Sequence, residues 1–238
     1  MKKIVLISGP SCVGKGPLLK ALAHFYPNIC WAEIPIIKSY ESRNGQPRTS
    51  EVDIWNNPDY FLPAAEFDKL DKSRFFIDDC RGYPQALDTN KLESVKDDIV
   101  LIEVYHTIGA KFRKWAETCL TAVAFRTVFI TPLSNNEIAV LKAQDISVSD
   151  YIENLFMSKQ LARAKVLGQN SDDPAVLRNF RQRAKDAFIE IQSAAHYTDI
   201  IVNHDGEGHP NWNFGIAGFS AYPAGDAGEA LKSLADIL

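Results

Sequence analysis

An apolar run, a glycine-containing loop and a helical segment follow one another at the start of the chain, and this order restricts its possible folds. Residues 3–8 read KIVLIS, residues 9–16 read GPSCVGKG, and residues 18–22 read LLKAL. Strand, glycine-rich loop and helix is the context that a phosphate-binding loop requires. Gly9 and Gly14 permit backbone angles that other residues avoid, so successive N–H groups can converge on phosphate oxygens. The pattern predicts an α/β fold whose first helix offers its N-terminus to phosphate.

Lys15 directly follows the second loop glycine, at the place of the lysine that reaches the β- and γ-phosphates. The alternative, an ordinary turn between strand and helix, does not explain this lysine. The motif normally continues with Ser or Thr, whose hydroxyl meets Mg²⁺, but here Gly16 and Pro17 follow. Any Mg²⁺ would therefore be held by water, nucleotide phosphates and a carboxylate elsewhere in the chain. The residues predicted to bind ATP are Gly9, Pro10, Ser11, Cys12, Val13, Gly14, Lys15 and Gly16.

Composition limits the class of protein. With 238 residues, 46% of them hydrophobic, the chain can bury a sizeable core and fits one domain with appended lobes. A net charge of −4 argues against a nucleic-acid binder, which usually presents a basic face. The apolar runs are shorter than the roughly 18 residues that cross a bilayer, so no membrane partner is expected. The four cysteines form no CxxC pair, so no metal site is predicted and the reducing cytoplasm is favoured.

Apolar runs alternate with helical patterns along the chain, which predicts a mostly parallel sheet with right-handed crossovers. Core strands are expected at Phe75–Asp78, Ile99–Val104, Thr127–Ile130 and Ile200–Val202. Helices are expected at Pro63–Leu70, Asn90–Val95, Thr107–Cys119, Ser134–Lys142 and Ala227–Leu238, and in two long segments that begin at Ser147 and Ser171.

Two segments between these elements are singled out by composition. Lys165–Asp173 is polar and contains glycine, which favours a mobile lid, and Asp173 with Pro174 is a typical helix start for a helix to about His196. Residues 204–225 are rich in Gly, Pro, Asn and aromatic residues, which favours a long ordered loop. Four of its side chains are of metal-ligand type, but with no matching cluster elsewhere a polar loop is the simpler interpretation. These four are His204, Asp205, Glu207 and His209.

Several motifs, taken in order, resemble the guanylate kinase family. The phosphate loop with the following PLLK is similar to the opening of that family, and later stretches resemble its "DYxF…EF", "DVQG", "IFIxPPS" and terminal "VVND" motifs. These later stretches are Asn57–Phe61 with Glu66 and Phe67, Ile99–Glu103 with Gly109, Val128–Ser134, and Arg183 with Ile200–Asn203. The resemblance covers most of residues 1–203.

The resemblance implies a P-loop NTP hydrolase fold of the α/β class, with a mostly parallel sheet flanked by helices. It implies a core of residues 1–30, 97–162 and 175–238, an inserted acceptor-binding lobe at about 31–96 and a lid at about 163–174. ATP and Mg²⁺ are the cofactors that it implies, and the partners are small-molecule nucleotide substrates. A monomer or homodimer is expected.

The region that would grip the acceptor phosphate departs from the family's "S…TTRxPR" and reads PIIKSYESRNGQPR over residues 35–48. Lys38 can take the place of the first arginine and Arg48 that of the second, while Arg43 is a competing candidate. Lysine is a point charge and lacks the planar fork of arginine. The resemblance also assigns the Tyr60 hydroxyl to the acceptor phosphate, with a half-buried aromatic residue as the structural alternative.

The resemblance implies a base pocket lined by carboxylates, because guanine needs acceptors for its ring N–H and exocyclic amine. Either Asp78 or Asp79 would serve, since adjacent strand residues point to opposite faces. Glu103 ends a central strand, and the alternative is that it caps the following turn. Tyr83 lies in residues 81–85, which replace the family's Tyr-Gly-Thr.

The predicted activity is ATP-dependent phosphoryl transfer to a nucleoside monophosphate, with GMP the acceptor that the resemblance implies. Lys15, Arg163 and Arg183 are the predicted catalytic residues, although either arginine can instead be a solvated helix charge. A degenerate nucleotide-binding scaffold and a kinase for another phosphorylated acceptor, such as a sugar phosphate, are the alternatives. An ATPase or a kinase for nucleic-acid ends is a third, which the acidic balance disfavours.

Overall fold

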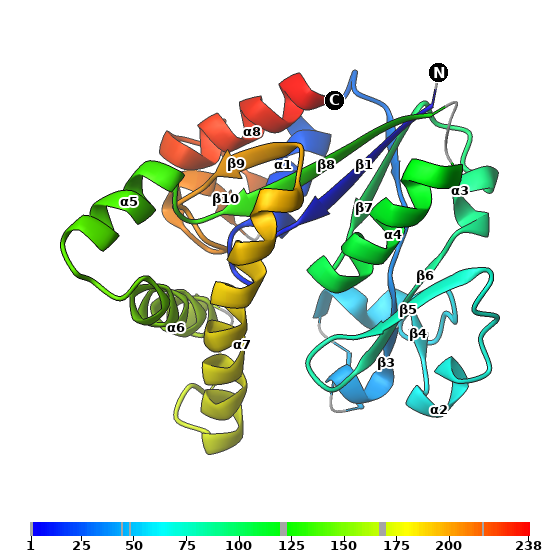
Figure 1. Ribbon diagram of the computed structural model, residues 1–238, viewed down its shortest axis with the longest axis horizontal. Coiled ribbons are helices and arrows are strands. Elements are labelled where there is room, and N and C mark those ends of the chain that lie inside the picture. Colours follow the sequence, from blue (N-terminus) through cyan, green and yellow to red (C-terminus); the bar gives the residue numbers. More distant parts are fainter. Residues whose placement is uncertain (1, 44, 48, 120–122, 167–169, 216) are drawn as a thin grey trace. The chain divides into compact units, whose positions relative to one another are not determined.

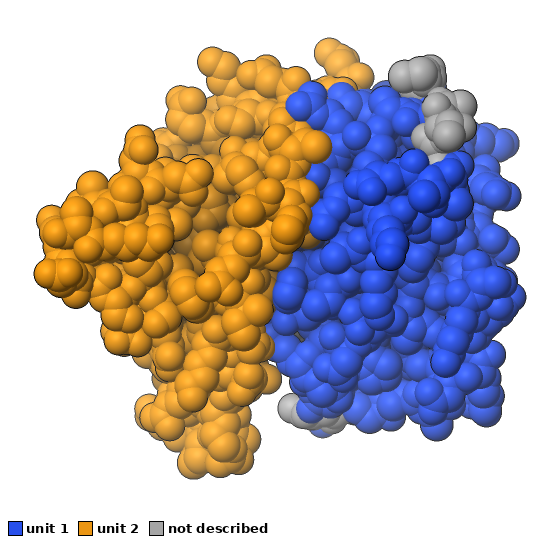
Figure 2. All heavy atoms as spheres, in the orientation of Figure 1, with its two compact units in different colours: residues 1–8, 30–127 blue, residues 9–29, 128–238 orange. Residues whose placement is uncertain are grey.

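The computed structural model describes the whole chain except residues 1, 44, 48, 120–122, 167–169 and 216. The described residues form two compact units, which Figure 2 distinguishes by colour. The first unit contains the chain up to Ser8 and Cys30–Thr127, and the second contains Gly9–Ile29 and Val128–Leu238. The prediction of a core, an acceptor lobe and a lid stays a prediction. None of the described helices is long and apolar enough to cross a membrane.

A parallel sheet lies at the centre of the first unit. β1 (Lys3–Ser8) pairs in parallel with β7 (Ile99–Glu103), and β7 pairs in parallel with β2 (Trp31–Glu33). The strand β8 (Ala124–Thr131) begins in this unit, where Ala124 donates its N–H to the carbonyl of Lys2. The middle residues of β1 and β7 are fully buried, because their continuous apolar runs are covered on both faces.

A second sheet in the first unit has the strand order β4-β3-β6-β5. Its strands are β3 (Ile37–Ser39), β4 (Phe61–Leu62), β5 (Phe75–Asp79) and β6 (Pro84–Asp88). The prediction that Phe75–Asp78 is a core strand of the parallel sheet is wrong, since β5 forms an antiparallel hairpin with β6 in this smaller sheet. The physical reason is that β5 packs on a small apolar cluster of its own, around Phe67 and Ala86.

Helices complete the first unit. α4 (His106–Cys119) buries Ile108, Phe112 and Ala116 and packs against β1 and β5. The shorter elements are α2 (Ala64–Phe67), α3 (Asn90–Ser94) and the 3-10 helices Tyr40–Arg43 and Thr49–Ile54. The helices predicted for α3 and α4 are confirmed, and the one predicted at Pro63–Leu70 is shorter than expected.

The second unit contains the end of β8, which pairs in parallel with β9 (Asp199–Val202). Its helices are α1 (Lys15–Phe25), α5 (Asn135–Ala143), α6 (Val148–Val166), α7 (Pro174–Gln192) and α8 (Gly225–Ile237). α6 and α7, of 19 residues each, pack against each other, and Figure 1 shows them as neighbours. Asp173 caps α7 as predicted, accepting the N–H of Ala175 at 2.7 Å, and a 3-10 turn, Ser193–His196, follows that helix.

The segment after β9 is more structured than the predicted long loop. It contains a 3-10 turn, Pro210–Trp212, and a small antiparallel pair of strands, β10 (Phe214–Gly215) and β11 (Gly218–Phe219). Trp212 is only 1% exposed. A buried tryptophan contributes a large apolar surface, so this segment is part of the core of the second unit.

Candidate nucleotide-binding site

The predicted phosphate loop has the backbone geometry that its glycines suggested. Gly9 has φ 150° and Gly14 has φ 97°, and Cys12 also has a positive φ, 65°. A Cβ added to Gly9 would approach the carbonyl oxygen of Ile130 to 2.4 Å, so a larger residue cannot be accommodated there. Gly14 is the left-handed N-cap of α1, which places the first turn of that helix directly after the loop.

Lys15 folds back over this loop. Its Nζ donates to the carbonyl of Gly9 at 2.6 Å and to that of Pro10 at 2.9 Å. The ammonium group therefore lies on the loop at the N-terminus of α1, where anions are favoured by the helix dipole and by free N–H groups. The side chain is half-buried, and it is the cation that the sequence predicted at this place.

Residues 203–212, here called the brace, pack against the phosphate loop from the segment after β9. The Asn203 amide donates to the carbonyl of Val13 at 2.8 Å, and the backbone N–H of Glu207 donates to the carbonyl of Cys12 at 3.3 Å. A Cβ at Gly14 would meet Asn203 Nδ2 at 2.5 Å and Trp212 Cζ2 at 3.0 Å. The brace thus occupies the space behind the loop and holds the carbonyls of Cys12 and Val13.

Asp205 anchors the brace. Its side chain is buried and accepts a hydrogen bond from the Asn211 amide at 2.9 Å. It also accepts one at 3.0 Å from the backbone N–H of Ala227, a residue in the first turn of α8. His209 Nδ1 lies 3.1 Å from the other carboxylate oxygen. A carboxylate that receives a helix N-terminal N–H satisfies one of the donors left open there, so Asp205 fixes the brace to α8.

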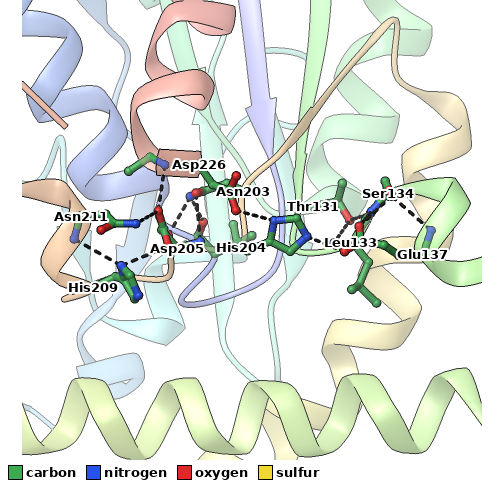
Figure 3. Close-up of polar contacts among 12 residues, drawn as sticks. Thr131, Leu133, Ser134, Glu137, Asn203, His204, Asp205, His209, Asn211 and Asp226 are labelled. Atoms are coloured by element: carbon green, nitrogen blue, oxygen red, sulfur yellow. Dashed lines mark hydrogen bonds and ion pairs between the residues drawn. The ribbon is translucent and has the colours of Figure 1, made fainter. Parts of the chain in front are cut away.

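His204 links three elements of the second unit, as Figure 3 shows. Its Nδ1 lies 2.6 Å from Asp226 on α8, and its Nε2 lies 2.8 Å from Glu137 on α5. Glu137 also closes a capping box with Ser134. Desolvation would lower the pKa of His204, but hydrogen bonds from the ring to Asp226 and Glu137 outweigh it and raise the pKa above its ordinary value. The imidazolium form is therefore favoured.

The three predicted catalytic cations gather near Cys12 in the phosphate loop. Burial raises the pKa of the Cys12 thiol above its ordinary value, and the charge of Glu207 acts in the same direction. Arg163, Arg183 and Lys15 oppose this shift, which means that all three charges are within electrostatic range of the loop. Arg163 is in the last turn of α6 and Arg183 is on α7, so the helix pair brings them together. Their catalytic roles stay predictions.

Glu207 was not predicted as part of this site. It forms an ion pair with Arg163, with Glu207 Oε2 at 2.5 Å from Arg163 Nε. A Cβ added to Gly16 would lie 3.7 Å from Glu207 Oε1, at ordinary contact distance. The missing hydroxyl at Gly16 was visible in the sequence, but the brace that brings Glu207 beside it depends on the tertiary fold.

The predicted acceptor residues lie in the first unit. Lys38 is on β3, and its N–H donates to the carbonyl of Tyr60 at 2.8 Å, so the two residues lie side by side at the β3–β4 pair. Burial and the charge of Glu103 raise the pKa of Glu33 at the end of β2, and the charge of Lys38 opposes that rise. Lys38 and Glu103 are therefore within electrostatic range of Glu33, and Tyr60 lies beside the backbone of Lys38.

Asp78 and Tyr83 lie on the β5–β6 hairpin. Burial would raise the pKa of Asp78, but the Lys111 ammonium and a hydrogen bond from the backbone N–H of Asp79 act in the opposite direction, and the pKa is lowered. Lys111 Nζ lies 3.1 Å from Asp78 Oδ1, so the carboxylate is ionised and tied to α4. Tyr83 is in the turn of the hairpin, where its carbonyl accepts the N–H of Cys80 at 2.8 Å.

Of the two arginines considered for the acceptor phosphate, the structure describes Arg43. The Arg43 guanidinium donates to Glu51 through Nε and Nη2, at 2.9 Å to each carboxylate oxygen. The Arg43 and Glu51 side chains are only 12% and 9% exposed, so this pair is part of the interior of the first unit. Arg48 lies outside the described residues. Among the side chains that the structure describes, no group of three or more His, Cys, Asp or Glu residues is arranged to hold a metal ion.

The parallel sheet, the glycine loop at the start of α1 and the lysine over that loop define a P-loop α/β protein. No protein-family model matches the chain. It is 34% identical over 213 residues to a guanylate kinase of Prochlorococcus marinus subsp. pastoris, with 86% of this chain and 91% of that protein covered. A guanylate kinase of Nostoc sp. is 26% identical over 211 residues, with 86% and 84% covered.

The chain belongs to the guanylate kinase family. A crystal structure of guanylate kinase from Anaplasma phagocytophilum agrees in fold, with a TM-score of 0.51 at 19% identity over 99% of this chain and 84% of that one. The predicted family, the P-loop α/β fold and the kinase class are thereby confirmed.

Proposed function

We propose that this protein transfers the γ-phosphoryl group of ATP to GMP. The observation that carries this proposal is Lys15 Nζ on the carbonyls of Gly9 and Pro10, over a loop with positive φ at Gly9, Cys12 and Gly14. Family membership adds the reaction class, because the relatives that the chain matches are guanylate kinases.

The residues present fit ATP. The loop N–H groups and Lys15 supply donors and positive charge for the β- and γ-phosphates at the N-terminus of α1. Gln160 on α6 supports the loop from the side: its Oε1 accepts from the Cys12 thiol at 3.5 Å. The Gln160 side-chain nitrogen is buried with no hydrogen-bond partner among the described residues, an open donor next to the loop. Mg²⁺, when bound, neutralises phosphate charge in such reactions.

Arg163 and Arg183 would stabilise the charge of the transferring group from the last turn of α6 and the middle of α7. In the structure Arg163 is held by Glu207, so it has to leave that carboxylate to contact a phosphate. The predicted lid at about residues 163–174 includes residues 167–169, which lie outside the described residues. A lid of this kind would exclude water, which otherwise accepts the phosphoryl group and hydrolyses ATP.

On the acceptor side, Lys38, Arg48 and Tyr60 would hold the GMP phosphate, and Asp78, Tyr83 and Glu103 would contact the base. An ionised Asp78 accepts hydrogen bonds, as the guanine ring N–H and amine require. No strong general base is needed, because the acceptor phosphate is already an anion. The partners are small nucleotides, and a cytoplasmic monomer or homodimer is part of the same proposal.

The test is a coupled ATP-consumption assay with Mg²⁺ across GMP, dGMP, AMP, CMP, UMP and ribose phosphates. Lys15→Ala should abolish turnover. Lys20→Ala is the matched control, because Lys20 is an exposed cation on the same helix and should retain full activity. Turnover with GMP that needs Lys15 supports the proposal.

Two results would contradict it. Turnover with a sugar phosphate in place of GMP would assign another acceptor. ATP binding without turnover on any acceptor would instead identify the degenerate nucleotide-binding scaffold.

A further inference from the structure

The phosphate loop lacks its hydroxyl at Gly16, and the brace places a carboxylate beside that position. Glu207 Oε1 would be 3.7 Å from a Cβ on Gly16. The backbone of Glu207 is tethered to the same loop, since its N–H donates to the carbonyl of Cys12 at 3.3 Å. Gly206 fixes this approach, because a Cβ there would come within 2.7 Å of that carbonyl oxygen. Both sides of the contact are in the second unit.

We propose that Glu207 is the protein ligand of the nucleotide-bound Mg²⁺, in place of the hydroxyl that Gly16 lacks. This inference rests on the proposed function, because it presumes that the loop binds a magnesium nucleotide. The chemistry of the donor fits. Mg²⁺ is a hard cation that takes oxygen ligands, and it is commonly bound by one or two carboxylates together with substrate phosphates and several waters.

The other carboxylate considered in the brace, that of Asp205, already has hydrogen-bond partners within the protein. Asp205 accepts from Asn211 and from the N-terminal turn of α8, and it faces His209. Moving it to a metal would break the contacts that hold the brace. Glu207 instead has about a quarter of its side chain exposed, 26%, beside the loop.

The ion pair of Glu207 with Arg163 is compatible with this role. Both side chains are partly exposed, 24% for Arg163 and 26% for Glu207, and each neutralises the other. A magnesium nucleotide offers an anion to Arg163 and a cation to Glu207. Both charges therefore keep an opposite charge when the pair separates, so binding leaves neither of them isolated.

The simpler alternative is that Glu207 only holds Arg163 in place. The two roles differ in one measurable quantity, the ratio between the affinity for ADP with Mg²⁺ and the affinity for ADP in EDTA. Loss of a structural ion pair changes both affinities together and leaves their ratio unchanged. Loss of a metal ligand reduces the affinity for ADP with Mg²⁺ selectively.

The experiment is isothermal titration of ADP into the full chain, with Mg²⁺ and with EDTA, for the wild type, Glu207→Ala and Glu207→Gln. The ratio should fall about tenfold in both variants, a size typical of weakened metal coordination. Glu229→Gln is the matched control, because it removes the same charge from an exposed position on α8 and should keep the wild-type ratio.

A rescue variant makes the test specific. Gly16→Ser restores the hydroxyl, and the space at Gly16 admits a Cβ at ordinary contact distance. In the Glu207→Ala background, Gly16→Ser should return the ratio toward that of the wild type. An unchanged ratio in Glu207→Ala, or a wild type whose ADP affinity is indifferent to Mg²⁺, overturns the inference. A wild type that binds no ADP overturns the proposed function itself.

Discussion

The phosphate loop of the second unit and the acceptor region of the first unit contrast in how their charged residues are held. The loop residues are consecutive in the chain, and their carbonyls and Lys15 are fixed by contacts with one another and with the brace. The acceptor candidates come from strands far apart in sequence, and several of their charges are paired within the unit, as in Asp78 with Lys111 and Arg43 with Glu51. The proposed recognition of phosphate by a contiguous loop is thus separable from the proposed recognition of the acceptor.

The largest expected loss of stability comes from removing a side chain that supports the phosphate loop. Trp212→Ala should destabilise the protein by about 3–5 kcal/mol, the usual cost of truncating a buried aromatic side chain. It should also weaken ADP binding, because Trp212 lies against Gly14 and donates to the carbonyls of Asp205 and Gly206. Urea unfolding and ADP titration measure both effects.

Trp212→Phe is the companion variant, since it retains an aromatic ring but removes the indole N–H and part of the packed surface. It should keep the fold and show a smaller loss of ADP affinity. If folded Trp212→Ala binds ADP as the wild type does, the brace does not support the loop.

The next largest effect is expected in the first unit, which contains the acceptor candidates. Glu51→Gln leaves the buried Arg43 guanidinium without its charged partner, which should cost about 3 kcal/mol. Hydrogen exchange should increase in residues 30–127, while ADP affinity stays unchanged. Glu66→Gln is the matched control: its pair with Lys69 is exposed, and losing such a pair costs about 0.5 kcal/mol or less. Weaker ADP binding in Glu51→Gln would contradict the separation of the two regions.

Asn203→Ala is expected to have a smaller effect, because it removes hydrogen bonds to backbone carbonyls and little packing. Asn203 is fully buried and donates to the carbonyls of Val13 and Asp205, both at 2.8 Å. Losing these two buried hydrogen bonds should cost about 2 kcal/mol. ADP affinity should fall with stability, as thermal unfolding and titration would show. A stability loss with unchanged ADP affinity would assign Asn203 to packing alone.

The smallest effect is a pH dependence from His204. Its pKa is raised in the folded protein, so its contribution is fully present below the ordinary value of 6.5 and is lost as pH rises through the folded pKa. The partner Glu137 has a lowered pKa: burial acts against this, and hydrogen bonds from Ser134 outweigh it. Its contribution is therefore lost as pH falls below 4.5 and through the folded pKa.

Wild type should exceed His204→Gln in stability near pH 6, and the difference should shrink at higher pH. The size is about 1 kcal/mol or less, because solvent screens these partly exposed charges. Thermal unfolding of both proteins across this range measures it. A constant difference between the two proteins would contradict a charged His204.

Local signals predicted a large part of the structure. The loop glycines and the position of Lys15 depend on residues close together in the sequence. The same is true of the Asp173 cap and of the apolar patterns of β7, α4 and α7, and these elements are confirmed. The short strands β2, β3, β4 and β6 were not predicted. Strands of two to five residues carry little periodicity, and long-range pairing decides whether they form.

The sequence alone determined the phosphate loop, because Gly9, Gly14 and Lys15 act through backbone angles and reach that need only their neighbours in the chain. Only the tertiary structure decided what surrounds it. Glu207 lies beside Gly16 because residues almost two hundred positions later fold back on the loop after β9, and their contacts follow from burial of Trp212 and Asp205. Packing between distant segments has no local signature, which is why a sequence motif can reveal that a group is missing but not what replaces it.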